Sequence, residues 1–178
     1  MKMRYLLGLM CMLICNVALG QNKNYRDQGY KGSVAISDQI GIFVGVETSH
    51  GWMINNHHYL GVGAGGFVYP DGRSYPAFAE VYLDYGAYFS NKRSTPVAGI
   101  KAGYINALHF GKTINGTVSK YSFEKGITIQ PLVGWSWGLK SGVGLTLGLS
   151  ANIVAPIGQN KGTKPLYAIP KLSFAFEF

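Results

Sequence analysis

The chain has 178 residues, with 16 lysines and arginines against 8 aspartates and glutamates and a formal net charge of +8. Its two cysteines, Cys11 and Cys15, both lie in an N-terminal stretch with the composition of a secretory leader. Once that leader is removed, the mature chain has no thiol, which excludes disulfides, thiolate catalysis and cysteine metal sites. The basic residues form no run that resembles a nucleic-acid footprint, so no nucleic-acid partner is expected.

The leader has the three parts of a signal peptide. Lys2 and Arg4 form a basic start, the apolar run that follows is too short to span a bilayer as a helix, and Ala18 and Gly20 supply the small residues that signal peptidase needs. An uncleaved anchor, the alternative, would need about 20 apolar residues. The predicted organisation is therefore a signal peptide (1–20), a short polar lead-in (21–29) and one domain (30–178).

After the lead-in, apolar and polar residues alternate with a period of two, which is the pattern of β-strands. The alternation is cleanest in 77–89, where Val81 and Leu83 fall on one face and Glu80 and Asp84 on the other. In the seventh segment the same alternation places Val143 on the apolar face. The predicted strands span 30–37, 41–54, 59–69, 77–89, 97–114, 117–137, 142–154 and 165–178.

The fifth and sixth segments are joined by Asn115-Gly116, which predicts a tight type I′ hairpin. Pairing them outward from this turn places Lys101 opposite Gln130, so that polar residues meet polar residues. The part nearest the turn, residues 106–122, is predicted to project beyond the membrane. Pro131 fits this strand poorly because it lacks a ladder donor, so it either counts against the barrel or marks a local bulge.

The last segment ends on a bare aromatic residue. Leu172 and Phe178 share its apolar face, and Lys171 and Glu177 lie on the other. A soluble protein rarely leaves such an edge free, whereas a closed barrel pairs its last strand with its first. An apolar face turned outward needs lipid. The sequence therefore predicts an all-β, eight-stranded antiparallel up-and-down transmembrane β-barrel with both termini periplasmic. A soluble sandwich and a lipocalin-like barrel are the alternatives.

Large outward aromatic residues fall at the strand ends on the predicted periplasmic side. This is where a membrane-spanning barrel carries its interfacial aromatic residues. The predicted aromatic girdle comprises Trp52, Phe89, Trp135, Trp137 and Phe176.

The inward face carries almost all the charge of the strands. Charges in a narrow lumen are costly to bury unless they are paired, so we expect a network, with Lys101 close to Glu80 or Asp84 on the adjacent strand. Such a network is interpreted as a polar plug that holds the barrel rigid, and an ion-conducting path is the alternative. The predicted lumen residues are Lys31, Glu47, Glu80, Asp84, Lys101, Lys171 and Glu177.

The leader, the eight alternating segments, the outward aromatics and the terminal Phe178 together resemble the small outer-membrane β-barrel proteins, the superfamily that contains the transmembrane part of outer membrane protein A and the opacity proteins. The runs GYKG (29–32) and TSHG (48–51) resemble the Bacteroidota branch. The resemblance implies a location in the cell outer membrane after signal-directed export. It also implies outer-membrane lipids and lipopolysaccharide as surroundings, periplasmic chaperones and the barrel-assembly machinery as partners, and an assembly signal in Phe174, Phe176 and Phe178.

Three functions are compatible with this pattern. The first is a non-enzymatic integral protein with a structural role or a surface role, in which the 106–122 hairpin meets an extracellular partner. The second is a narrow porin-like channel, and the third is a lipid A-modifying enzyme. The last would use His50 with Ser49 and Glu47, but alternation places His50 outward and the other two inward, so no catalytic residue is predicted. Neither a metal nor a cofactor is expected.

Overall fold

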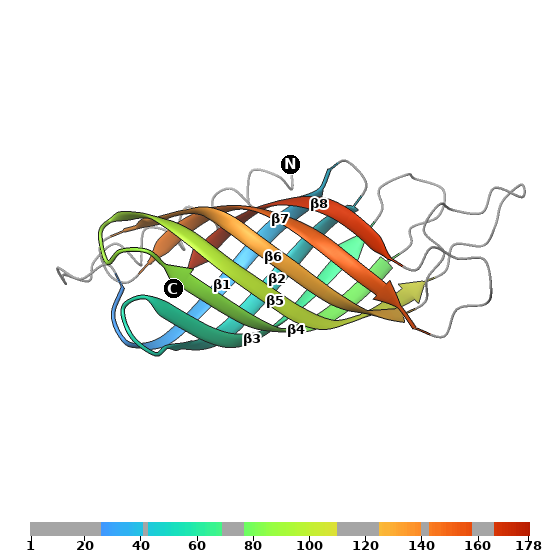
Figure 1. Ribbon diagram of the computed structural model, residues 1–178, viewed down its shortest axis with the longest axis horizontal. Coiled ribbons are helices and arrows are strands. Elements are labelled where there is room, and N and C mark those ends of the chain that lie inside the picture. Colours follow the sequence, from blue (N-terminus) through green and yellow to red (C-terminus); the bar gives the residue numbers. More distant parts are fainter. Residues whose placement is uncertain (1–25, 41–42, 69–76, 110–124, 140–142, 158–165) are drawn as a thin grey trace, which may run out of the picture.

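The computed structural model describes residues 26–40, 43–68, 77–109, 125–139, 143–157 and 166–178. Within these ranges no helix is long and apolar enough to cross a membrane. The chain forms strands throughout (Figure 1): β1 (Gly29–Gln39), β2 (Phe43–Met53), β3 (His58–Val68), β4 (Ala77–Tyr88), β5 (Ser94–His109), β6 (Lys125–Gly138), β7 (Gly144–Pro156) and β8 (Tyr167–Glu177).

The eight strands close into one barrel in which each strand pairs antiparallel with its neighbours in sequence. The barrel is closed by β8, which pairs with β1 from Ser33↔Glu177 to Asp38↔Leu172. The terminal segment therefore finds its partner in the first strand, because a closed sheet has no free edge. The all-β, eight-stranded antiparallel fold predicted from the sequence is confirmed.

The two ends of the barrel differ in their connections. At one end, here called the turn end, lie Arg26, Phe178 and the short connections 54–57, 89–93 and 139–143. The opposite loop end carries the remaining connections, which are drawn in grey for the most part in Figure 1. Most of the predicted 106–122 hairpin lies outside the described residues. The loop-end connections are 40–42, 69–76, 110–124 and 157–166.

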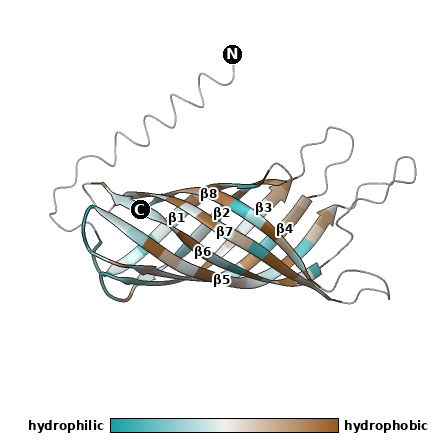
Figure 2. Cartoon of the chain, turned by 45° about the horizontal axis from the view of Figure 1, so that its top comes forward, coloured by the Kyte–Doolittle hydropathy of each residue, from teal (hydrophilic) through white to brown (hydrophobic). Residues whose placement is uncertain are grey.

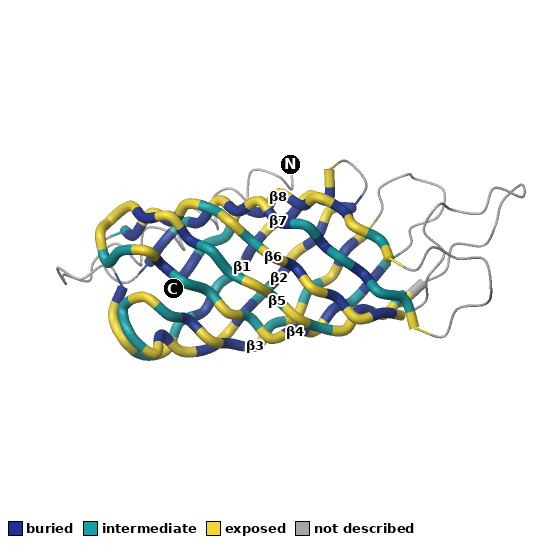
Figure 3. Tube along the Cα trace, in the orientation of Figure 1, coloured by how far each residue is buried: buried dark blue, intermediate teal, exposed yellow. Residues whose placement is uncertain are grey.

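Burial alternates residue by residue along the strands, as Figure 3 shows. On β2, Val46 exposes 58% of its surface whereas Glu47 exposes 1%. Figure 2 shows hydrophobic and hydrophilic residues interspersed along the strands. Apolar residues dominate the outside of the barrel, and the strand charges lie mostly inside. A soluble barrel has the opposite distribution, with apolar residues inside and charged residues outside. The exterior of this barrel is therefore suited to a lipid bilayer rather than to water.

The register expected from the Asn115-Gly116 turn is confirmed, because Lys101 pairs with Gln130. The bulge expected at Pro131 does not form, since Pro131 pairs with Ile100 without a change of register. On the β7 side the paired residues stop at Ile129 and resume at Leu132 with the same offset. Proline thus interrupts the hydrogen-bond ladder on one side only, as its missing N–H requires.

Several strand boundaries differ from the predicted ranges, among them those of β1 and β7. β1 runs on to Gln39, and the turn falls at Ile40, whose φ of 38° lies in the left-handed region. Val143 was predicted on the outward face, but it is only 5% exposed. The reason is that β7 begins at Gly144, so Val143 belongs to the preceding turn and lies over the lumen opening.

Candidate functional site in the barrel lumen

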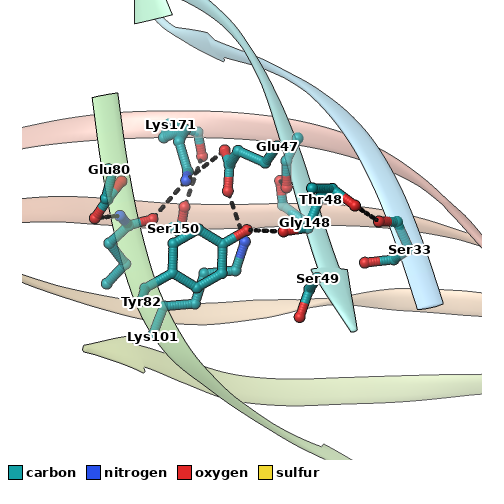
Figure 4. Close-up of polar contacts among 12 residues, drawn as sticks. Ser33, Glu47, Thr48, Ser49, Glu80, Tyr82, Lys101, Gly148, Ser150 and Lys171 are labelled. Atoms are coloured by element: carbon teal, nitrogen blue, oxygen red, sulfur yellow. Dashed lines mark hydrogen bonds and ion pairs between the residues drawn. The ribbon is translucent and has the colours of Figure 1, made fainter. Parts of the chain in front are cut away.

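The centre of the lumen holds a cluster built around the Glu47 carboxylate, here called the Glu47 cluster (Figure 4). One Glu47 oxygen accepts from Lys101 Nζ at 2.6 Å and the other from Lys171 Nζ at 2.8 Å. Lys171 also donates to Gln130 Oε1 at 2.5 Å. Glu47, Lys171 and Gln130 are each 1% exposed. Glu47, from β2, therefore joins β5 and β8 across the lumen.

Glu80 is connected to the Glu47 cluster through the neutral side chain of Gln130. Its Oε1 accepts from Gln130 Nε2 at 2.6 Å and from the hydroxyl of Thr128. The sequence placed Lys101 near Glu80 or Asp84, and Asp84 does face Lys101 in the ladder. The ammonium of Lys101 nevertheless bonds to Glu47, because a long side chain in a narrow barrel reaches across the lumen as easily as along the wall.

A second cluster surrounds Glu177, near the turn end. Its carboxylate accepts from Lys31 Nζ at 3.0 Å and from the Tyr88 hydroxyl and Thr146 Oγ1 at 2.8 Å each. Lys31 also donates to the Tyr88 hydroxyl at 2.5 Å. These donors come from β1, β4 and β7, so this Glu177 cluster ties the last strand to three others from the inside.

Arg26, from the lead-in, covers the turn-end opening of the lumen. Although it precedes β1, it is only 5% exposed. Its Nη1 donates to Lys92 O at 2.7 Å and its Nη2 to Ser136 Oγ at 2.9 Å. The guanidinium carbon lies 4.8 Å from the centre of the Tyr88 ring. Burial lowers the pKa of Arg26 while the Glu177 carboxylate opposes that shift, and an arginine pKa starts high enough for the side chain to remain charged.

Apolar side chains close the lumen at the loop end. Phe67, 1% exposed, packs there in a cluster with residues from four other strands, and the rings of Phe43 and Phe78 meet edge-on at 5.4 Å. This loop-end apolar cluster comprises Phe43, Phe67, Phe78, Ile105 and Val154, with Ala107 and Tyr167 packed against it.

Between the loop-end cluster and the turn end lie two small cavities, of about 80 and about 100 Å³. Both are lined by Lys31 and Glu177. The inner one also reaches Glu47 and Lys101, and the outer one reaches Arg26. Each has room for a few water molecules, which polar walls of this kind hold readily.

The outer surface of the turn end carries large aromatic side chains. Trp52 is 62% exposed and Phe89 68%, and Trp135 Nε1 donates to Ser94 Oγ at 2.6 Å. Phe178 is also outward, and its backbone exchanges two hydrogen bonds with Gly32, at 2.7 and 2.9 Å. The remaining predicted girdle and assembly residues, Trp137, Phe174 and Phe176, lie on the same outward face.

The structure separates the three residues considered for lipid A chemistry. His50 lies outward, where its ring nitrogens contact Tyr30 and Thr48 at 2.6 and 2.9 Å. Ser49 and Glu47 are buried in the lumen. The wall of the barrel thus stands between His50 and both of its candidate partners. Among the described residues, no group of three or more His, Cys, Asp or Glu side chains could hold a metal ion.

No family model and no curated protein matches the chain. Its fold resembles the N-terminal β-barrel domain of Pseudomonas aeruginosa OprF, with a TM-score of 0.56 and 11% identity over 88% of this chain and 100% of that one. It also resembles Neisserial surface protein A, with a TM-score of 0.57 and 16% identity over 83% of this chain and 92% of that one. At these identities the likeness concerns the fold alone, a closed antiparallel β-barrel.

Two parts of this site were not predicted. Gln130 and Thr128 lie at inward positions of β6, and the strand pattern could have identified them as partners for an inward carboxylate. Arg26 had no such signal, because it lies in a polar stretch without periodicity. Its position depends on carbonyl groups of the turn after β4 and on Ser136, which are distant in sequence.

Proposed function

We propose that the mature chain is an integral outer-membrane protein with a structural or surface-interaction role and no enzymatic activity. The observation that carries the proposal is the inverted barrel: its outward strand positions are mainly apolar, while its lumen is filled by paired charges and capped by the loop-end apolar cluster. A protein of this kind is stable only when lipid covers the exterior. A filled lumen supports a rigid scaffold that presents its connections.

The proposal extends to export, orientation and partners. Residues 1–20 act as the signal peptide, and the turn end with both mature termini faces the periplasm. Phe174, Phe176 and Phe178 form the signal read by the barrel-assembly machinery after delivery by periplasmic chaperones. Outer-membrane lipids and lipopolysaccharide surround the apolar band, and the 106–122 hairpin is offered to an extracellular partner. The aromatic residues at the turn end support this orientation, since such side chains favour a membrane interface.

Fractionation of a Gram-negative host that expresses the full chain tests the location. We expect the protein in the outer-membrane fraction, migrating faster on a denaturing gel before boiling than after it, because a closed barrel resists unfolding by detergent. Deleting residues 174–178 removes the proposed assembly signal and should shift the chain to the periplasm or to degradation. Recovery of the full chain as a soluble periplasmic protein would contradict the proposal.

The channel alternative has less support. The two lumen cavities are small, and the apolar cluster fills the loop end of the lumen in the part of the chain that the structure describes. An ion would have to pass both this cluster and the Glu47 cluster. The enzyme alternative is not advanced, because His50 lies on the opposite side of the wall from Ser49 and Glu47.

A further inference from the structure

The turn-end opening of the lumen has the chemistry of a guanidinium-binding site. Arg26 donates four hydrogen bonds to this rim, at distances from 2.7 to 3.5 Å. The acceptors are the carbonyl oxygens of Ser90, Lys92 and Ser136 and the Ser136 Oγ. The Tyr88 ring lies 4.8 Å from the guanidinium carbon. The acceptors come from the turn after β4 and from β6, which are two separate parts of the rim.

The positions of these acceptors fit a planar, forked guanidinium group better than a single ammonium group. Guanidinium has donors on two sides, so Nη1 can bond to the β4–β5 turn while Nη2 bonds to Ser136. Its central carbon also lies over an aromatic ring, that of Tyr88, within cation–π range. A lysine ammonium has one nitrogen and could not hold both parts of the rim with the same geometry. The shape of the Arg26 side chain therefore contributes to its binding at this rim, as its charge does.

The occupant of this site comes from outside the barrel wall. Arg26 precedes β1 and lines the outer cavity together with Lys31, Val143 and Glu177. That cavity shares Lys31 and Glu177 with the inner one. With the loop end filled by apolar side chains, Arg26 covers the charged lumen at the turn end. Among the described residues it does so together with Val143 and with the buried cluster of Met53, Tyr59, Tyr88 and Val97.

We propose that the turn-end rim is a guanidinium-binding site that the lead-in fills in cis, so that Arg26 acts as a stopper that closes the lumen on this side. A displaced lead-in would leave the site open to another guanidinium group, such as an arginine side chain of a peptide. The proposal concerns the barrel itself and does not depend on its cellular location.

Cysteine labelling tests the stopper directly, because the mature chain contains no native thiol. Val143→Cys places a reporter in the outer cavity at a position that is 5% exposed. With the mature chain refolded in detergent micelles, a small cationic methanethiosulfonate reagent should label this cysteine at least tenfold faster in Arg26→Ala than with Arg26 present. Arg26→Lys should also label fast. Lys125→Cys, exposed at the opposite rim, is the matched control and should label equally in all backgrounds.

Chemical rescue tests the site. Methylguanidinium added to the Arg26→Ala reporter should slow labelling of Val143→Cys in a saturable manner, whereas methylammonium at the same concentration should not. Equal labelling of the Arg26 and Arg26→Ala reporters would overturn the stopper. Three results, obtained while the barrel remains folded, would each overturn the guanidinium site. The first is slow labelling in Arg26→Lys, the second is equal protection by methylammonium, and the third is no protection by methylguanidinium.

Discussion

Replacement of Glu47 by glutamine is expected to lower the free energy of unfolding by about 3–5 kcal/mol, the loss typical when one partner of a buried ion pair is removed. Glu47 is 1% exposed and is the carboxylate partner of both Lys101 and Lys171. The substitution preserves size but removes the carboxylate with which both lumen ammonium groups form their ion pairs. Urea unfolding of the barrel in lipid vesicles, followed by tryptophan fluorescence, measures the change.

Two further variants make this result specific. Asp84→Asn removes a lumen carboxylate that belongs to none of the ion pairs formed by the described residues, and it should cost much less. Adding Lys171→Met to Glu47→Gln should recover part of the loss, because removing a buried charge together with its partner is often nearly neutral. If Glu47→Gln costs no more than Asp84→Asn, the Glu47 cluster does not stabilise the barrel.

Truncation of Phe67 to alanine is expected to have the other large effect. Phe67 is 1% exposed and packs in the loop-end apolar cluster, and the centre of its ring lies 5.7 Å from Lys171 Nζ. Loss of a buried phenylalanine typically costs about 3–5 kcal/mol, part of which comes from the cavity that remains. We expect lower stability in urea. In planar bilayers no current should appear, because the Glu47 cluster and Arg26 still obstruct the lumen.

Phe89→Ala is the matched control, because Phe89 is 68% exposed and lies outside the lumen at the turn end. It should lower stability less than Phe67→Ala and leave the bilayer current unchanged. A stability loss in Phe67→Ala no larger than that in Phe89→Ala would mean that the loop-end cluster contributes little to the fold. A steady current through the parent barrel would mean that the lumen is not closed, and it would restore the channel alternative.

The period-two pattern predicted most of the fold, because every strand of this barrel wall has one apolar and one polar face. It correctly separated Val81 and Leu83 from Glu80 and Asp84. The Asn115-Gly116 turn supplied the register that placed Lys101 opposite Gln130. It failed at Val143, where the chain had already left the strand for a turn. Alternation has no meaning once the strand ends, so boundaries remained the weakest part of the prediction.

The partners of the lumen charges were harder to predict than their direction. Pairing along the wall follows from register, but pairing across the lumen depends on barrel radius and side-chain length, and the pattern specifies neither. Lys101 therefore has Asp84 as its ladder neighbour and Glu47 as its ion-pair partner. Arg26 was beyond prediction for a different reason, since its acceptors are mainly backbone carbonyls that any sequence would supply.

The position of the tryptophans in a bilayer tests the central claim most directly. All three, Trp52, Trp135 and Trp137, lie outward at the turn end of the barrel. The native chain, refolded into vesicles of brominated phosphatidylcholine, should be quenched strongly when the bromines lie near the glycerol backbone and weakly when they lie near the chain ends. Absence of quenching, or strongest quenching by bromines at the bilayer centre, would contradict a barrel that spans the membrane with this aromatic band at its interface.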